Sequence, residues 1–389
     1  MIREATEREE VERWFLHQGL PHLIHQYGAS TDVFTRALPF LLFVFLFNTL
    51  GSFGDRFTGW GQAGVAVLSA VIILGLAAGV NVLRGRRPLQ PPDDVGLVEL
   101  TMFVIVPVVP TLLFQDDQLL PVLGVVAFNL VVLALVYVVV GFGLAPMTVW
   151  ALGQTFRRLS EVVTLMGRAL PLVLVVTAFL FINAELWQVA QGFTTMTFLT
   201  TVGLLVFLAV AFVVLRIPRE IAEISRFESW PAVCRLAERA GSPLKGREPA
   251  ELGGRCDPPL TALDRINVGL VVLFNLGLQI VLVSAAIGAF YILFGLFAVR
   301  EDTIVAWTAL TQLGDPVASI TLAGTELVLT TELLRVAGFL SAFSSLQFAV
   351  AAVTDATYRQ EFFDEVTDEV REALAVRSIY LDQLVEDAP

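Results

Sequence analysis

Charge is scarce in this chain of 389 residues. Only 16% of the residues are charged, whereas 56% are hydrophobic and the mean hydropathy is +0.74. Ordinary soluble domains carry about a quarter of their residues as charged side chains. A water-soluble fold does not need so much apolar surface. The composition therefore excludes a soluble globular protein and indicates helices that lie in a bilayer.

Cysteine and histidine are also rare, with two and three residues respectively. Cys234 and Cys256 stand in a polar stretch without a CxxC or Cys/His cluster, which excludes a disulfide framework. The histidines precede the first apolar run, and two of them could share a helical face, but no carboxylate or cysteine completes a metal site. We expect interfacial histidines and no bound metal; they are His17, His22 and His25.

Catalytic signatures are missing as well. The chain has no G-x-S-x-G, H-E-x-x-H, phosphate-binding glycine loop or dinucleotide fingerprint. Carboxylates such as Glu99, Glu185 and Asp264 stand at the edges of the apolar runs, whereas ion-coupled carriers place such groups near the midplane. We therefore expect neither an enzyme nor a cofactor, and no strong coupling to an ion gradient.

Long apolar runs are what the chain does have. A helix that crosses about 30 Å of hydrocarbon needs about 20 apolar residues. Eight runs of this kind predict an all-α, polytopic transmembrane helical bundle, in which the run with Pro107 and Pro110 is kinked. The eight predicted spans are 37–57, 64–83, 95–114, 119–149, 169–187, 193–215, 266–298 and 334–353.

Basic residues give the orientation, because arginine-rich short loops stay in the cytoplasm. Arginines cluster after every second span, which puts both termini on the cytoplasmic side of a multi-pass protein of the cell membrane. The opening residues lack the basic and then apolar start of a signal peptide, so we expect no cleaved leader. Residues 355–389 hold ten acids against three arginines, which makes nucleic acid an improbable partner and membrane lipids the expected one.

A possible duplication divides the chain. Arg36-Ala37-Leu38-Pro39 recurs as Arg168-Ala169-Leu170-Pro171, as expected for two related four-span bundles, although short apolar identities also arise by chance. The predicted parts are an interfacial segment (1–35), a first bundle (36–158), a second bundle (159–353) with a cytoplasmic loop (216–265) and a non-cytoplasmic segment (299–333), and an acidic C-terminal helix (354–389).

The C-terminal segment repeats apolar residues at spacings of three and four, which is typical of a helix with one buried face. That face could form a small homo-oligomeric coiled coil, or it could dock on the protein's own cytoplasmic loop. A cytoplasmic protein partner could also bind this acidic tail. The residues of the face are Phe363, Val366, Val370, Ala373, Arg377, Tyr380 and Leu384.

Uncharged polar side chains within and near the spans are the candidates for a permeation path, although each could equally form hydrogen bonds between helices. The segment 303–324 consists of two short apolar runs around Gly314-Asp315-Pro316, which predicts either a re-entrant loop or an external cap. The candidates are Asn48, Asn81, Asn129, Thr194, Thr195, Thr197, Thr200, Thr201, Asn275, Gln279, Thr308, Thr311, Asp315 and Gln347.

Three functional hypotheses follow from this sequence. The first is a channel-like homo-oligomer that forms a permeation path for a small ion or solute. The second is a transporter built from two duplicated bundles, and the third is a non-transporting scaffold or accessory subunit that recruits cytoplasmic partners. We place the channel-like hypothesis first.

Overall fold

The computed structural model describes residues 2–25, 27–52, 75, 95–108, 119–157, 174–249, 252–322, 325–356, 359 and 364–386. These residues form helices and one short hairpin, so the protein is all-α. Four of the described helices are long and apolar enough to cross a membrane, and a bent helix pair would make a fifth. The described chain divides into unit 1 (Met1–Val11 with Thr148–Pro389) and unit 2 (Glu12–Met147).

Unit 2 is built on three helices that share an apolar core. Leu41 and Phe45 of α2 pack in this core with Phe103 of α4 and with Val132 and Val136 of α6. Up to residue 157, the described elements are α1 (Ile2–His17), a 3-10 turn (Pro21–Leu23), a π-helical turn (Ala29–Val33), α2 (Phe34–Ser52), α4 (Leu97–Ile105), α6 (Leu119–Gly141) and α7 (Leu144–Arg157). α1 and α7 each belong partly to unit 1 and partly to unit 2.

The predicted span 119–149 is not one helix. It ends as α6 at Gly141, and α7 begins at Leu144. Gly143 between them has a positive φ of 64°, which glycine adopts without steric cost. A Cβ atom at Gly143 would also lie 2.9 Å from the Cδ atom of Pro21. The break therefore depends on a glycine that is needed both for its backbone angle and for close packing.

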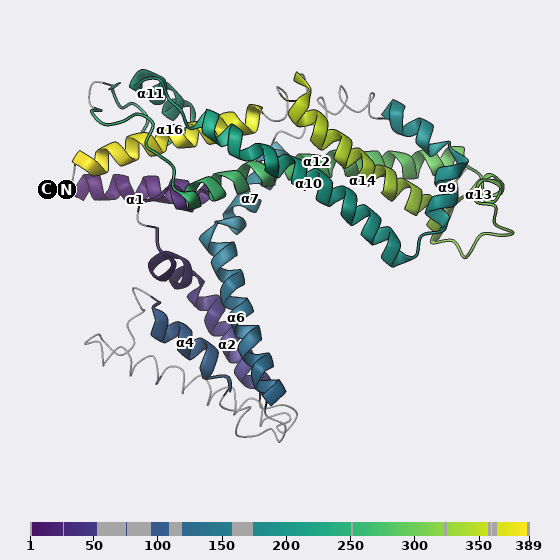
Figure 1. Cartoon of the computed structure of the whole chain (residues 1–389), viewed down its shortest axis with the longest axis horizontal. Helices are drawn as coiled ribbons and strands as arrows, with labels where there is room; N and C mark the ends of the chain where they lie inside the picture. The colour runs from purple at the N-terminus through teal and green to yellow at the C-terminus, as the bar shows by residue number, and fades with distance from the viewer. Residues whose placement is uncertain are drawn as a thin grey trace. The chain divides into compact units, whose positions relative to one another are not determined.

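Unit 1 contains a three-helix bundle, made of α10 (Thr195–Ile224), α12 (Ala262–Ala298) and α14 (Thr331–Thr354) (Figure 1). Each helix contacts the other two. Each also begins at a threonine whose hydroxyl accepts a hydrogen bond from the first turn. These helices confirm the apolar runs 193–215, 266–298 and 334–353 as helical. α10 continues past the predicted end, α12 begins before the predicted start, and α14 is longer at both ends.

The predicted span 169–187 is bent instead of straight. In its described part, the helix Leu174–Phe181 meets α9 (Ala184–Gln191) at an angle of 72°. Asn183 accepts a hydrogen bond from the Glu185 N–H and so begins α9. The Trp187 indole N–H donates to the Phe181 carbonyl at 2.7 Å, which fixes the bend.

Between α12 and α14, the chain forms α13 (Glu301–Thr308) and a two-stranded antiparallel hairpin of β1 (Ala318–Leu322) and β2 (Thr325–Leu329). The sequence predicted no strand here. β1 is exposed along its whole length. An exposed sheet edge is not stable in hydrocarbon, because its unpaired N–H and C=O groups need water. This geometry favours the external cap over the re-entrant loop.

The other end of the bundle carries what we call the end module: α11 (Trp230–Arg239), α16 (Asp364–Glu386), the loop residues 240–249 and 252–261, and the polar ends of α10 and α12. α16 packs on α11, α12 and α10 (Figure 1). Val366, Val370, Ala373 and Tyr380 are all buried there. The face predicted as a coiled-coil seam is therefore covered by the protein itself, as the docking alternative required. Phe363 lies outside the described residues.

Eight spans and the duplication stay predictions. The predicted span 64–83 lies outside the described residues apart from Gly75, and so does Arg168, one of the two arginines of the repeat. The same holds for Pro110 and for the end of the span 95–114. Arg36 in α2 pairs with Asp32 at 3.6 Å.

Candidate functional site

Three buried oxygen atoms in the bundle have no hydrogen-bond partner among the residues that the structure describes. They are Oε1 of Gln279 in α12, and Oγ of Ser344 and Oε1 of Gln347 in α14. The Ser344 side chain is fully buried. A buried polar atom without a partner costs about 1–3 kcal/mol, so most such atoms in proteins are paired. In the described bundle these three oxygens are therefore open to a hydrogen-bond donor or a cation.

The helix register puts these oxygens at one level of the bundle. α12 and α14 run antiparallel and touch at two points, since the Ser341 hydroxyl donates to the Ser284 carbonyl at 2.6 Å and a Cβ atom on Gly295 would meet Leu333. Gln279 lies five residues before Ser284, and Gln347 lies six residues after Ser341. At 1.5 Å per residue, the two glutamines lie within about one helical turn of the same depth.

Three oxygen acceptors at one depth define the chemistry of this level. Amide and hydroxyl oxygens bind alkali cations, water and protonated amines, because each of these presents positive charge or a donated hydrogen. They bear no formal charge, so they would hold a cation weakly enough for release. Conduction requires a site that binds the ion well enough for it to enter and weakly enough for it to leave.

Asn48 and Asn129, two of the predicted path residues, belong to unit 2 and meet there. The Asn48 amide donates to the Asn129 carbonyl oxygen at 2.6 Å, which joins α2 to α6. The Asn129 amide reaches the Val104 carbonyl oxygen at 3.5 Å. In this arrangement the two side chains act as hydrogen-bonding contacts between helices. Asn81 lies outside the described residues.

The threonines at the start of α10 do not line an interior path in the described chain. Thr194 and Thr197 form a reciprocal cap at the first turn. The Thr200 hydroxyl donates to the Met196 carbonyl and the Thr201 hydroxyl to the Thr197 carbonyl. Thr195 is exposed, like Thr194, Thr197 and Thr200. The described hydrogen bonds of these hydroxyl groups stay within their own helix and its cap.

The remaining predicted residues are separate from the three oxygens. The Asn275 amide donates to the Val271 carbonyl in its own helix, and the buried Thr308 hydroxyl donates to the Ile304 carbonyl in α13. Thr311 and Asp315 are exposed between α13 and β1. Of the predicted residues, Gln279 alone joins Gln347 at this level. The sequence candidates did not include Ser344, although a serine pair inside an apolar run was a usable signal.

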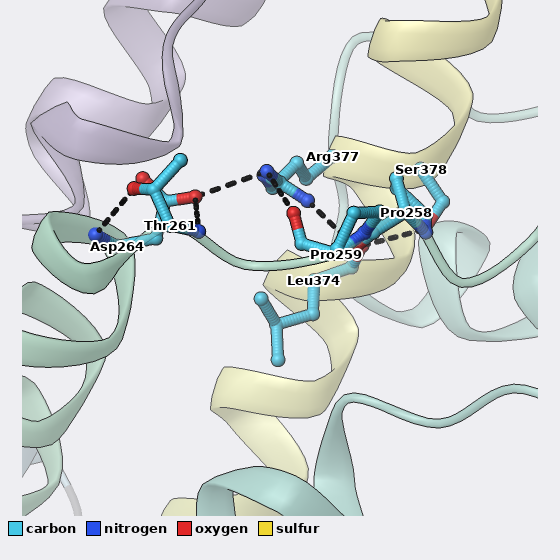
Figure 2. A network of polar contacts seen from close by, with 7 residues as sticks. All are labelled: Pro258, Pro259, Thr261, Asp264, Leu374, Arg377 and Ser378. Carbon is cyan, nitrogen blue, oxygen red and sulfur yellow. Dashed lines mark hydrogen bonds and ion pairs between the residues drawn. The ribbon is translucent and has the colours of Figure 1, made fainter.

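The end module holds a second polar centre, a buried ion pair. The Arg377 guanidinium donates to Asp264 Oδ2 at 3.0 Å, and the two side chains are only 8% and 6% exposed. It also donates to the carbonyls of Pro258 and Pro259 (Figure 2). Burial lowers the pKa of Arg377 from its ordinary value, and the Asp264 carboxylate offsets part of that shift. Asp264 belongs to the first turn of α12, where Thr261 caps the helix.

No protein-family model, no curated protein and no solved structure matches this chain. The class that the described structure defines is an all-α protein with helices suited to a membrane. Its function must therefore be inferred from its own residues.

Proposed function

We propose that the protein is a channel-like membrane protein that passes a small ion or polar solute through the bundle of unit 1. On its way through the bundle, the permeating species contacts the polar side chains of Gln279, Ser344 and Gln347. The observation that carries the proposal is the set of three buried oxygens on α12 and α14, at similar depth and without partners among the described residues. The proposal includes eight spans with both termini in the cytoplasm of a cell-membrane protein, as the arginine pattern predicts.

A monovalent cation is the first species to test. The three atoms are neutral oxygens, which favours a cation over an anion, and a neutral site suits a species that sheds only part of its hydration. We do not propose an oligomer that forms through α16, because the face that would form a coiled coil is buried within the chain.

The experiment is ion flux through purified protein in liposomes that contain a potassium-sensitive or sodium-sensitive dye. The test variant is Gln279→Leu with Gln347→Leu, which removes two of the three oxygens and keeps side chains of similar size. The control is Gln312→Leu, the same substitution at an exposed position between α13 and β1. We expect flux above that of protein-free liposomes, a loss of at least about tenfold in the test variant, and no change in the control.

Two results would contradict the proposal. One is flux no greater than in empty liposomes for the folded wild-type protein. The other is a test variant that conducts like the control, because permeation would then not pass the level of the glutamines. A rate that saturates with cation concentration and does not follow the imposed voltage would instead favour the transporter hypothesis.

A further inference from the structure

Arg377 lies in a cage of three oxygen atoms at the polar end of α12. Its guanidinium donates to Asp264 Oδ2 at 3.0 Å, to the Pro258 carbonyl at 3.2 Å and to the Pro259 carbonyl at 3.3 Å (Figure 2). One carboxylate together with backbone carbonyls is an oxygen set that proteins use to bind hard cations. Arg377 therefore fills a place whose chemistry also suits an inorganic cation.

The cation and the cage come from different elements of unit 1. Arg377 belongs to α16, whereas the three oxygens belong to the loop before α12 and to the first turn of α12. The N-terminal end of a helix carries a partial positive charge, which repels a cation and is offset here by the Asp264 carboxylate. The guanidinium is therefore held less tightly than in a pair away from a helix terminus, and it leaves the cage whenever α16 detaches.

Buried polar side chains continue from this cage along one face of α12. Asn267 is fully buried, and Asn275 is 8% exposed. Together with Asp264 and Gln279, they fall within about 120° of the helix circumference at 3.6 residues per turn. Gln279 lies 15 residues after Asp264, which corresponds to about 22 Å along the helix axis. This polar face therefore leads from the cage to the level of the three unpartnered oxygens.

We infer that the cage is the cation site at one mouth of the permeation path and that Arg377 closes this mouth as a tethered cation. In the closed state the guanidinium occupies the site, and no permeating ion enters. When α16 detaches, the Asp264 carboxylate attracts a monovalent cation, which then passes along the polar face of α12 to Gln279. Because Arg377 is tethered, its effective concentration at the cage is high and the closed state dominates. This inference rests on the proposed permeation function and adds its regulation.

The test is the liposome flux assay with Arg377→Met, which empties the cage and keeps an unbranched side chain. Flux should rise at least about tenfold above that of the wild type. Guanidinium chloride at about 10 mM, the order of an intramolecular effective concentration, should then lower the flux again, because the free ion fits the emptied cage. Tetramethylammonium chloride, which has no N–H donor, should have no effect.

Two control variants separate the cage from its surroundings. Asp264→Asn combined with Arg377→Met removes the carboxylate, so its flux should not respond to guanidinium. Arg265→Met removes the same charge as Arg377→Met from an exposed position next to Asp264, and its flux should equal that of the wild type.

Asp382→Ala covers the case in which Arg377→Met does not fold. Asp382 lies in α16, five residues after Arg377, and accepts hydrogen bonds from the Gly254 N–H at 2.7 Å and the Gly253 N–H at 3.3 Å. Both glycines are exposed, so water can bind these N–H groups once the carboxylate is gone. The variant loosens α16 and leaves the cage intact, and its flux should rise about tenfold.

The results distinguish this inference from the proposed function. If wild-type flux depends on Gln279 and Gln347 but is unchanged in folded Arg377→Met or Asp382→Ala, Arg377 is not a plug and the permeation proposal stands. An effect of guanidinium that persists without the Asp264 carboxylate would also overturn the plug. Flux at the level of empty liposomes in the wild type and in both variants would overturn the permeation proposal and this inference with it.

Discussion

Replacing Arg377 with methionine removes the cation from the most buried ion pair of the end module. Asp264, 6% exposed, keeps its hydrogen bond from the Thr261 N–H, but it loses its only described cation. The carbonyls of Pro258 and Pro259 lose their donor as well. Removing one partner of a buried pair costs about 3–5 kcal/mol. Because the hydrogen bond from the Thr261 N–H to Asp264 survives, we take the lower end of this range, about 3 kcal/mol. This corresponds to a roughly 150-fold larger equilibrium constant for the detachment of α16.

Cys234 offers a direct assay of that detachment. Its thiol is buried in α11, which α16 covers, and it is not in a disulfide. In a Cys256→Ser background, the rate at which a maleimide modifies Cys234 reports how often α16 leaves α11. Arg377→Met should raise this rate roughly 150-fold. Arg265→Met, next to Asp264 in sequence but exposed, is the matched control and should leave the rate unchanged.

The double variant decides whether the ion pair is the cause. Asp264→Asn removes the buried negative charge and keeps an oxygen that can still accept from the Thr261 N–H. Combined with Arg377→Met, it should bring the rate back to within about tenfold of wild type, since no charge is then buried without a partner. A single variant that reacts like wild type, or a double variant that reacts faster than the single one, would refute this reasoning.

Three further predictions use thermal unfolding in detergent. Burial raises the pKa of Glu372 above its ordinary value of 4.5, so the folded chain holds this proton more tightly than the unfolded chain. The protein therefore loses stability as the pH rises through the raised pKa. Glu372→Gln should be more stable than the wild type at pH 7.5, and this difference should vanish below about pH 4.5. Gly288→Val should cost about 1–3 kcal/mol, because a Cβ atom there already lies 3.3 Å from Ser341. Asn129→Leu removes the bond to Asn48 and should cost about 0.6 kcal/mol.

The long helices of unit 1 could be predicted from sequence because an uninterrupted apolar run leaves the backbone one stable arrangement in a bilayer. The breaks were harder to see. Gly143 interrupts the run 119–149 through a positive φ and close packing against Pro21, which is distant in sequence. The bend at Asn183 depends on a cap and on a bond from Trp187, and neither changes the hydropathy of the run. Local backbone geometry, not composition, decides both.

The C-terminal helix shows what a spacing pattern can and cannot establish. The residues of the predicted face from Val366 to Tyr380 are buried in α16, but so is every residue from Ala373 to Tyr380, so the helix is buried on all sides there. The pattern predicted neither this complete burial nor the surface that covers the helix. Arg377 within the apolar face was the available signal, since a buried arginine needs a carboxylate nearby. That carboxylate, Asp264, lies more than a hundred residues earlier in the chain, and only the folded structure brings the two together. The oxygen level of the bundle depends on long-range packing in the same way.

The ion pair between Arg377 and Asp264 also has a consequence for biosynthesis. α16 is synthesised after α10, α11 and α12, so Asp264 has left the ribosome before Arg377, its cation, is synthesised. During that interval the start of α12 carries a carboxylate that lacks its final counter-ion, and the face of α11 around Cys234 stays uncovered. A nascent chain that stops before Arg377 would keep both features permanently, so quality-control proteases could distinguish it from a finished one by the surface that α16 normally hides.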